Sequence, residues 1–575
     1  MATIDIIIVI AFLVGITLVG FWQMKGKNSS SDNFFLAGRS LKWPMIGLSL
    51  FAANISTIHL VGLASSGFNE GMVWGVFEWL AVVSLLFLAF VFAPFYFKSK
   101  ISTLPEFLEL RYDARSRTVF AFIAILSALF VHIGISLYTG AIIFQRFFGI
   151  GVWTSIIIIA SVTLCYYLAG GLKAVVYTQS VQTIVLLSGS VILTILGLNA
   201  LGDYMNELGM SNSFFENFSE LVRQGQLSVL HTQSSIDSIT ETINTEYTSN
   251  GFDPLSSSGL TWYAALLGYP ILGFWYWCSD QTIVQQVLGA KTLDDSQRGP
   301  LFAGFLKLTT PLIMVLPGVI AYILFKNDVF EASMSSVPPC SKPGDMALNV
   351  LVEKLLPTGL KGLFSAALLA ALMSTIAAAL NSVSTLVSID IVKRIKPSIS
   401  DAALMKVGRL SAIVIIIIAA LWSTQGDKFS SVFEAINKFA SALAPPVAVV
   451  LLMGVLYKRG TKEASLYTLL TGLLLGVTCF ILDFKFTADG TAYITDVLGI
   501  PFMMQAWWLF CICMVVYLAV SAVTPKPPTE ITDAYVWKNI KDIFKPSNQV
   551  KPDLRIVAIL LIITLILICT FFTLL

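Results

Sequence analysis

The sequence contains few charged residues and none of the short motifs that mark common enzymes. Asp, Glu, Lys and Arg make up only 12% of its 575 residues, whereas 56% are hydrophobic; a soluble domain has roughly 25% charged residues. The 36 basic and 34 acidic residues nearly balance, which argues against a nucleic-acid-binding surface. The P-loop, HExxH and GxSxG motifs are all missing from the sequence. These absences disfavour a soluble domain, an ATP-driven pump and a hydrolytic enzyme.

Cysteine is scarce, and the spacing of the cysteines indicates no pairing. Six of the seven cysteines lie within apolar runs, and only Cys340 lies in a connecting loop. No CxxC spacing and no disulfide framework can be built from them. We therefore expect most of them to be small buried residues rather than metal ligands.

Long apolar runs fill most of the chain, and each is long enough for a membrane-spanning helix of about 20 residues. The sequence therefore predicts an all-α polytopic protein embedded in a lipid bilayer, with about fourteen transmembrane helices. The first run has no basic segment before it and no small-residue cleavage site after it, so we expect it to be retained. The runs lie near residues 4–22, 42–67, 73–97, 118–146, 151–169, 176–201, 261–287, 299–326, 358–391, 404–424, 431–457, 463–483, 503–524 and 554–575.

Basic residues alternate between successive loops. The loop after the first run holds Lys25, Lys27 and Arg39, and later alternate loops are also basic, whereas the long loop 202–260 is acidic. Cytoplasmic loops carry the excess of Lys and Arg. The alternation predicts a multi-pass plasma-membrane protein with both termini outside the cytoplasm.

Two of the runs are interrupted. The run 42–67 contains Asn54, Ser56, Thr57 and His59 together, and the run 261–287 contains Gly268-Tyr269-Pro270 before a polar end. Polar residues inside a membrane are costly and mark substrate or ion paths. Interrupted spans at matching positions in two halves indicate an inverted-repeat transporter with a midplane site. We predict a peripheral segment 1–41, a first repeat 42–201, an external loop 202–260, a second repeat 261–457 and peripheral helices in 458–575.

A cation site is predicted between the first interrupted run and the run 358–391. Ala371, Ser374 and Thr375 share one helical face, and a break in the other helix would free the carbonyls of Ala52 and Ile55. Five neutral oxygens suit a hard monovalent cation such as sodium, and the absence of a carboxylate argues against calcium. The residues alone leave a second interpretation equally open, in which the two hydroxyls are interhelical packing residues.

A second group of polar side chains lies within the apolar runs. Hydrogen-bond donors and acceptors of both kinds, with aromatic plates beside them, suit the hydroxyls and the C–H face of a sugar or other polyol. Alternatives stay open: a structural ion pair, an aromatic belt at the membrane interface, and a satisfied core histidine. The candidates are His59, Glu78, Lys307 and Asn437, with Trp275, Tyr276 and Trp277 as the aromatic residues.

Several stretches resemble the sodium/solute symporter family, in particular its sodium/glucose cotransporter branch. The similarity runs from about residue 30 to 460. The stretches are Phe35-Leu36-Ala37-Gly38-Arg39-Ser40-Leu41, Ala52-Ala53-Asn54-Ile55-Ser56, Phe77-Glu78-Trp79, Gly170-Gly171-Leu172-Lys173-Ala174-Val175, Trp275-Tyr276-Trp277-Cys278-Ser279-Asp280-Gln281 and Leu380-Asn381-Ser382.

The resemblance implies a LeuT-type five-plus-five inverted repeat with alternating access. It also implies the functional residues: sodium ligands Ala52, Ile55, Ala371, Ser374 and Thr375; sugar contacts His59, Glu78, Trp277, Lys307 and Asn437; an inner gate at Tyr276; and an outer gate of Leu63, Phe77 and Phe433.

The sequence departs from the family at several of these positions. Asn437 stands where the branch usually has Gln, and Gln179, Ala377 and Ala378 replace the ligands of a second sodium site found in some members. We therefore expect one sodium ion per sugar. The loop around Cys340 lacks the cysteines of the animal members, which favours a bacterial inner membrane.

The sequence therefore favours sodium-coupled import of a monosaccharide similar to glucose or galactose. Transport of inositol, a sugar acid or an amino acid is the alternative within the family. A sugar-binding sensor or ligand-gated channel, and more remotely an intramembrane enzyme, are alternatives from other classes. The sequence leaves the oligomeric state open.

Overall fold

The computed structural model describes residues 2–22, 30–210, 213–222, 226–249, 259–326, 343–423, 432–483, 493–539, 543 and 553–574. Within these residues the chain is almost entirely helical. The helices that precede residue 210 are α1 (Thr3–Trp22), α2 (Ser31–Leu36), α3 (Trp43–Asn54), α4 (Thr57–Glu70), α5 (Gly75–Phe87), α6 (Ala93–Ser99), α7 (Leu104–Arg111), α8 (Ala114–Ser127), α9 (Ser136–Phe148) and α10 (Val152–Glu207).

The second half of the chain contains a longer series of helices. They are α11 (Phe214–Leu221), α12 (Gln233–Ser249), α13 (Trp262–Leu267), α14 (Tyr269–Gly273), α15 (Gln281–Leu288), α16 (Leu293–Met314), α17 (Leu316–Lys326), α18 (Pro343–Leu355), α19 (Leu360–Thr385), α20 (Lys393–Ile395), α21 (Asp401–Ser423), α22 (Val432–Leu456), α23 (Lys462–Asp483), α24 (Phe502–Val523), α25 (Thr529–Tyr535) and α26 (Asp553–Leu574).

π-helical turns interrupt several of the long helices. Wide turns of this kind often occur at functional sites. They span Leu88–Phe92, Ala128–Ile135, Phe274–Ser279 and Leu386–Val392.

Eleven helices in the described residues are long and apolar enough to cross a membrane. The chain is therefore the multi-pass helical protein that its composition predicts. The number of these helices is smaller than the fourteen predicted spans because some spans are broken and two others are joined. The predicted spans 42–67 and 261–287 are broken into short segments, and the spans 151–169 and 176–201 lie in the single element α10. The total of fourteen spans stays a prediction.

A sharp bend at Gly171 divides α10. This residue has φ +56° and ψ −148°, far from helical values. A Cβ atom at this position would lie 2.2 Å from the Phe34 carbonyl oxygen. Only glycine tolerates both the positive φ and the close approach. Gly171 therefore allows the 56 residues of α10 to form two helical segments that run in different directions.

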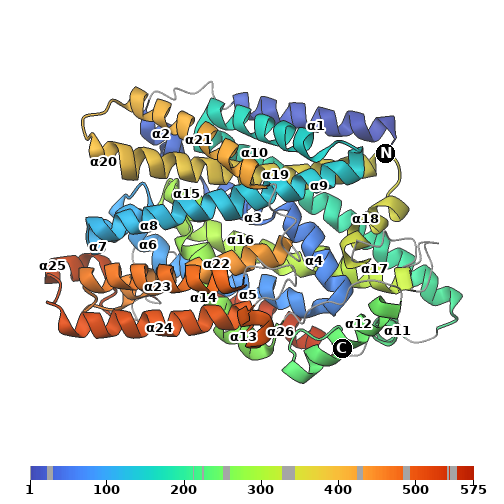
Figure 1. The fold of residues 1–575 in the computed structure, drawn as a ribbon. Helices are drawn as coiled ribbons and strands as arrows, with labels where there is room; N and C mark the ends of the chain where they lie inside the picture. The colour runs from blue at the N-terminus through green and yellow to red at the C-terminus, as the bar shows by residue number, and fades with distance from the viewer. Residues whose placement is uncertain are drawn as a thin grey trace.

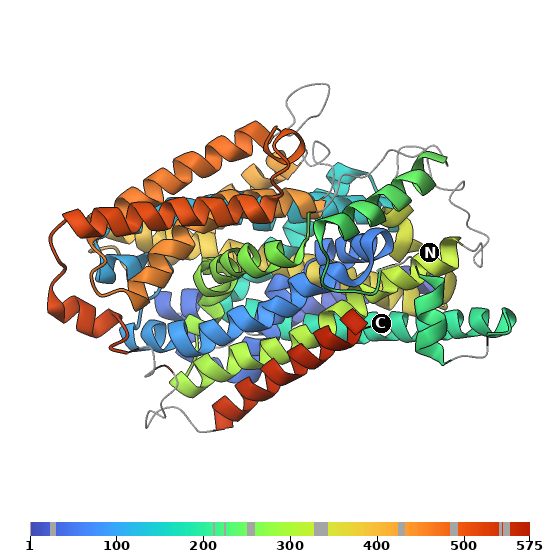
Figure 2. The same ribbon diagram turned by 90° about the horizontal axis from the view of Figure 1, so that it is seen from below.

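The long helices run roughly side by side, with the most central ones surrounded by others (Figures 1 and 2). In α19 and the turn that follows it, 94% of the most apolar window is buried, compared with 22% in α1 and 17% in α26. Central helices therefore carry polar residues that face protein, whereas α1 and α26 expose apolar surface suited to lipid.

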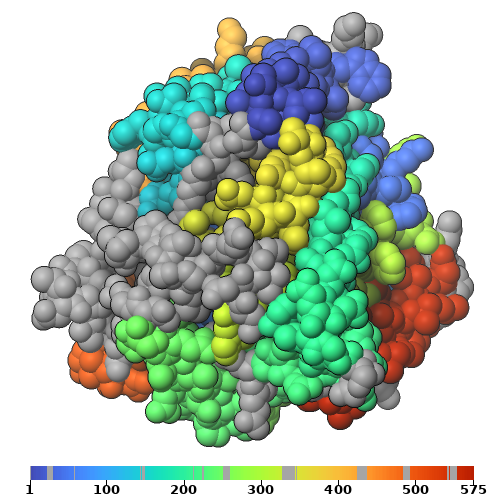
Figure 3. Space-filling model, turned by 90° about the vertical axis from the view of Figure 1, so that its right-hand side faces the viewer, coloured from blue at the N-terminus to red at the C-terminus, as the bar shows by residue number. Residues whose placement is uncertain are grey.

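Both termini lie towards the same end of the molecule, together with α11, α12 and α18 (Figure 1). Figure 3 views this end and shows segments of α10, α12 and α18 on its surface. The helices α7, α20 and α25 lie at the opposite end. This arrangement places the acidic loop on the side of the termini. Which side faces the cytoplasm stays a prediction.

Candidate functional site

The first interrupted span is a helix that stops and restarts. The helix α3 ends at Asn54, and Ile55 (φ −77°, ψ 107°) and Ser56 (φ −105°, ψ 172°) are extended before α4 begins. The last carbonyls of a helix have no partner within it. The break therefore leaves carbonyl oxygens in a buried region, because residues 51–56 are all buried.

Two hydroxyls from α19 bind these carbonyls. The Ser374 Oγ lies 2.6 Å from the Ala52 oxygen and 2.7 Å from the Ala371 oxygen. The Thr375 Oγ1 lies 3.1 Å from the Ala53 oxygen and 3.4 Å from the Ala371 oxygen. Two hydroxyls and three carbonyls thus form a cluster of five neutral oxygens. A cation placed among them would be attracted by the partial negative charge of all five.

The predicted sodium ligands thus come together, with one difference. Ile55 lies in the break and is fully buried, but Thr375 bonds to the carbonyl of Ala53. The helix ends at residue 54, so the carbonyl of residue 53 is also unpartnered within it. Ala53 is not among the ligands predicted from the sequence, although the position of the break indicates it. Its carbonyl is a further candidate ligand.

Gln179 on α10 links both sides of this site. Its Nε2 donates to the Ser374 carbonyl at 3.0 Å, and its Oε1 accepts a hydrogen bond from Ser49 Oγ on α3 at 2.5 Å. Gln179 is fully buried. The amide therefore joins α10, α3 and α19 beside the predicted sodium site.

A buried ion pair lies within the predicted sugar-binding group. The Lys307 ammonium on α16 donates to the Glu78 carboxylate on α5, and both side chains are at most 2% exposed. The ammonium also lies 5.6 Å from the centre of the Trp277 ring and 6.0 Å from that of Phe51. The two charges neutralise each other, which is how a charged side chain is tolerated in a membrane interior.

The other predicted sugar-site residues lie in the same region of the molecule. The charges of Glu78 and Lys307 act on the His59 ring, and the Tyr276 and Trp277 rings are 5.2 Å apart at 76°. Asn437 on α22 is buried. The structure pairs Lys307 with Glu78 and places the Lys307 ammonium near the Trp277 ring. A contact between Asn437 and the pair stays a prediction.

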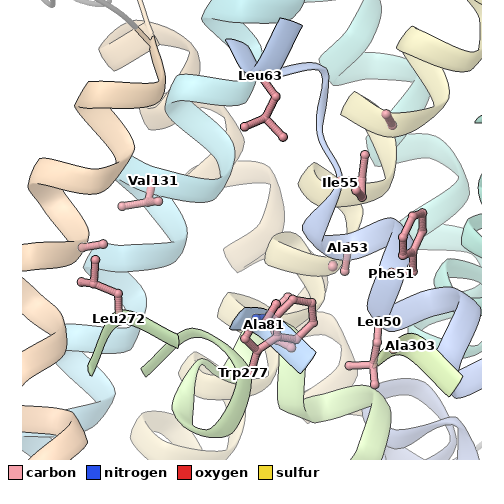
Figure 4. Close-up of a cluster of buried hydrophobic side chains, with 14 of the residues drawn as sticks. Leu50, Phe51, Ala53, Ile55, Leu63, Ala81, Val131, Leu272, Trp277 and Ala303 are labelled. Carbon is pink, nitrogen blue, oxygen red and sulfur yellow. The ribbon is translucent and has the colours of Figure 1, made fainter. Parts of the chain in front are cut away.

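Apolar side chains enclose this region from several helices (Figure 4). Leu63, predicted as part of the outer gate, is fully buried on α4, and Phe77 packs edge-to-face on Tyr269 with ring centres 4.8 Å apart. In the same view Leu63 lies near the top, Leu272 at the left and Trp277 near the bottom. The third predicted gate residue, Phe433, has a side chain outside the described residues.

A buried His–Asp pair was not singled out from the sequence as a pair. His132 Nε2 lies 3.0 Å from Asp280 Oδ2, and Ser127 Oγ lies 3.3 Å from the same oxygen. The other oxygen, Oδ1, accepts the Thr282 N–H at 2.7 Å and so caps α15. The pair ties the π-helical turn Ala128–Ile135 to the start of α15, just after Tyr276.

Charged residues also join the helices at the end opposite the termini. Arg117 Nε and Thr103 Oγ1 both donate to Asp390 Oδ1, at 2.7 and 2.9 Å. Arg111 donates to three backbone carbonyls at and just beyond the end of α22, at 2.8 to 3.1 Å. These contacts hold α7 and α8 against the π-helical turn Leu386–Val392 and the end of α22.

A family model and several relatives match this chain. The model of the "Sodium:solute symporter family" matches residues 34–472. The chain belongs to the sodium:solute symporter family. It is 33% identical to sodium/glucose cotransporter 1 of Ovis aries over 93% of this chain and 80% of the relative. It is 31% identical to sodium/myo-inositol cotransporter 2 of Homo sapiens over 95% and 81%.

Solved structures show the same fold. A sodium-coupled sialic acid symporter in an outward-open state has a TM-score of 0.70 at 20% identity, covering 91% of this chain and 98% of that one. The transporter Mhp1 in a closed conformation has a TM-score of 0.52 at 14% identity, covering 88% and 99%. The predicted LeuT-type fold is thereby confirmed, whereas the family match confirms the predicted family and coupling ion. This symporter family member is a sodium-coupled solute transporter of the membrane.

Proposed function

We propose that this symporter imports a neutral monosaccharide or a similar cyclic polyol together with sodium. The observation that carries the proposal is the buried Glu78–Lys307 pair beside Trp277. A sugar hydroxyl can donate to a carboxylate and accept from an ammonium, so a polyol can take the place of the direct contact. An anionic substrate would be repelled by Glu78 as well as attracted by Lys307, so it would bind less favourably than a neutral polyol. The similarity to cotransporters of glucose and of myo-inositol supports the same class.

Sodium binds at the break in the first interrupted span. The proposed ligands are Ser374 and Thr375 with the carbonyls of Ala371, Ala52 and Ile55, to which Ala53 is added. Entry of the ion lets each hydroxyl turn its oxygen to the ion, and this fixes α19 against α3. The membrane potential contributes about 2.3 kcal/mol per charge per 100 mV to uptake.

Alternating access then moves both solutes inwards. The outer gate is formed by Leu63, Phe77 and Phe433, and the inner gate by Tyr276. Sugar contacts come from His59, Glu78, Trp277, Lys307 and Asn437. We further propose that the termini lie outside the cytoplasm and that one sodium ion accompanies each sugar.

The test is uptake of labelled solutes into proteoliposomes with an inward sodium gradient. We expect accumulation of glucose, galactose or myo-inositol above the external concentration, and none without sodium. Ser374→Ala and Thr375→Ala should remove the sodium dependence. Thr385→Ala is the matched control, because the Thr385 hydroxyl bonds to the Asn381 carbonyl of its own helix. Sodium dependence that survives both substitutions contradicts the proposed sodium site.

Two outcomes separate the alternatives. Equilibration of the sugar without accumulation indicates a channel or a sensor rather than a symporter. Accumulation of a sugar acid in preference to neutral sugars contradicts the role given to Glu78.

A further inference from the structure

A predicted sugar-site residue holds the backbone of the predicted sodium site. The Ser56 backbone N–H donates to the Nδ1 atom of His59 at 3.3 Å, and the Ser56 hydroxyl lies 3.2 Å from the same nitrogen. Ser56 is the N-cap of α4 and His59 is its third residue. A side chain at that position that accepts the N-cap N–H is half of a capping box.

The N–H that His59 binds is the one that a continuous helix would give to Ala52. In an α-helix each N–H donates to the carbonyl four residues earlier. The last such bond in α3 runs from the Ile55 N–H to the Phe51 oxygen, at 2.9 Å. The next would join Ser56 to Ala52. Instead Ser56 N–H turns to His59, and the Ala52 oxygen accepts the Ser374 hydroxyl at 2.6 Å.

The contact also fixes the state of the imidazole. A backbone N–H can only donate, so Nδ1 must offer its lone pair and carries no proton. The neutral ring then has its single proton on Nε2 and is a donor there. The ring lies within the electrostatic influence of Glu78, Lys307 and His132, which is the region of the proposed sugar contacts.

We propose that His59 is a positioning residue for sodium as well as a sugar contact. Its Nδ1 keeps the Ser56 N–H away from the Ala52 carbonyl and so leaves that carbonyl available to the ion. Its Nε2–H donates to a hydroxyl of the polyol. This inference extends the proposed function, on which it depends, by naming the atoms that connect the two sites.

The connection works in both directions. Donation from Nε2–H to a hydroxyl makes Nδ1 a better acceptor, because hydrogen bonds in a chain polarise one another. A firmer Ser56–His59 bond stabilises the break and keeps the Ala52 oxygen free for sodium. Sodium bound at that oxygen in turn prevents the helix from closing. By linkage, each ligand raises the affinity for the other by the same factor.

The decisive measurement is sodium affinity in the absence of sugar. Purified full-length protein is titrated with sodium, and binding is followed by competition with ²²Na. In His59→Leu no acceptor remains, so Ser56 N–H can return to the Ala52 oxygen. The ion then loses the Ala52 carbonyl as a ligand, which weakens sodium binding by about 3- to 10-fold. A histidine that only contacts sugar would leave this affinity unchanged.

Two further variants make the result specific. His59→Gln should keep near-normal sodium affinity, because the Gln Oε1 can accept the Ser56 N–H as in other capping boxes. Ser56→Ala should also keep it, because it retains the N–H and removes only the hydroxyl. If His59→Leu does not fold, His59→Phe serves as the second apolar variant, with a ring but no acceptor.

The outcomes separate this inference from the proposed function. Unchanged sodium affinity in the apolar variant overturns the inference, and so does a loss in His59→Gln or Ser56→Ala equal to that in His59→Leu. Ser374→Ala is measured in parallel. If Ser374→Ala binds sodium normally, the sodium site itself is wrong; if Ser374→Ala does not bind while His59→Leu binds with unchanged affinity, only the role of His59 is wrong.

Discussion

Breaking the Glu78–Lys307 pair provides the sharpest test of the buried polar site. Lys307→Met leaves the Glu78 carboxylate in an apolar interior, where both partners are at most 2% exposed. Removal of one partner from a buried pair costs about 3–5 kcal/mol, mainly because the remaining charge is uncompensated. The polyol would also lose the ammonium that donates to one of its hydroxyls.

The assay combines thermal unfolding of the purified protein with sodium-driven uptake. We expect Lys307→Met to lower the unfolding temperature and to abolish sugar uptake. Lys326→Met is the matched control, because Lys326 pairs with Glu246 at 3.2 Å but is 47% exposed. Exposed pairs contribute roughly 0–1 kcal/mol, so this control should unfold close to the unmodified protein.

A double variant separates stability from function. Glu78→Gln combined with Lys307→Met leaves no buried charge, and replacing both partners of a pair is often neutral for stability. We therefore expect the double variant to recover most of the lost stability but not sugar uptake. Equal unfolding temperatures for Lys307→Met and the unmodified protein would refute the reasoning, as would uptake that returns in the double variant.

Three further predictions concern other parts of the molecule. Flux measurements should give one sodium ion per sugar, because Gln179, Ala377 and Ala378 offer a second ion only one side-chain oxygen, and that oxygen already accepts the Ser49 hydroxyl at 2.5 Å; a ratio of two contradicts this. Arg111→Met should destabilise the protein by about 3 kcal/mol or more in thermal unfolding, because three carbonyls, two of them in buried hydrogen bonds, lose a charged donor. Unchanged stability would show that water replaces the arginine. Burial lowers the pKa of His231, so protonation of this residue favours the unfolded segment, and the stability of residues 226–249 should be complete above about pH 6.5 and fall below it. Limited proteolysis at pH 5 and pH 7.5 should detect this loss, and His231→Asn should remove the difference between the two pH values.

Much of the architecture could be predicted because the bilayer restricts what a sequence can do. Apolar runs of sufficient length must be helices, and the polar interruption at Asn54–His59 had to meet protein rather than lipid. The helical face of Ala371, Ser374 and Thr375 therefore pointed to a partner helix with free carbonyls, and the structure brings those hydroxyls to α3.

The details that the sequence did not predict are contacts between side chains and backbone. Hydrophobic periodicity reports which residues are buried, but it does not say which polar atoms meet. The position where α3 ends decides that Thr375 meets Ala53, and boundaries of helices are the least reliable part of sequence interpretation. The pairing of His132 with Asp280 joins residues 148 positions apart, which no local pattern can reveal.

The same limit explains why the two sites looked independent in the sequence. His59 was assigned to the sugar by its position in an apolar run, and Ala52 to sodium by its place at the break. A helix that continued through residue 56 would satisfy the Ala52 oxygen with a backbone N–H and leave no ligand for the ion. Only a side chain that accepts this N–H from within the next helix can hold the break open, and His59 is the residue that does so. Coupling between ion and sugar then needs no long pathway, because the histidine ring that donates to one also releases the carbonyl that binds the other.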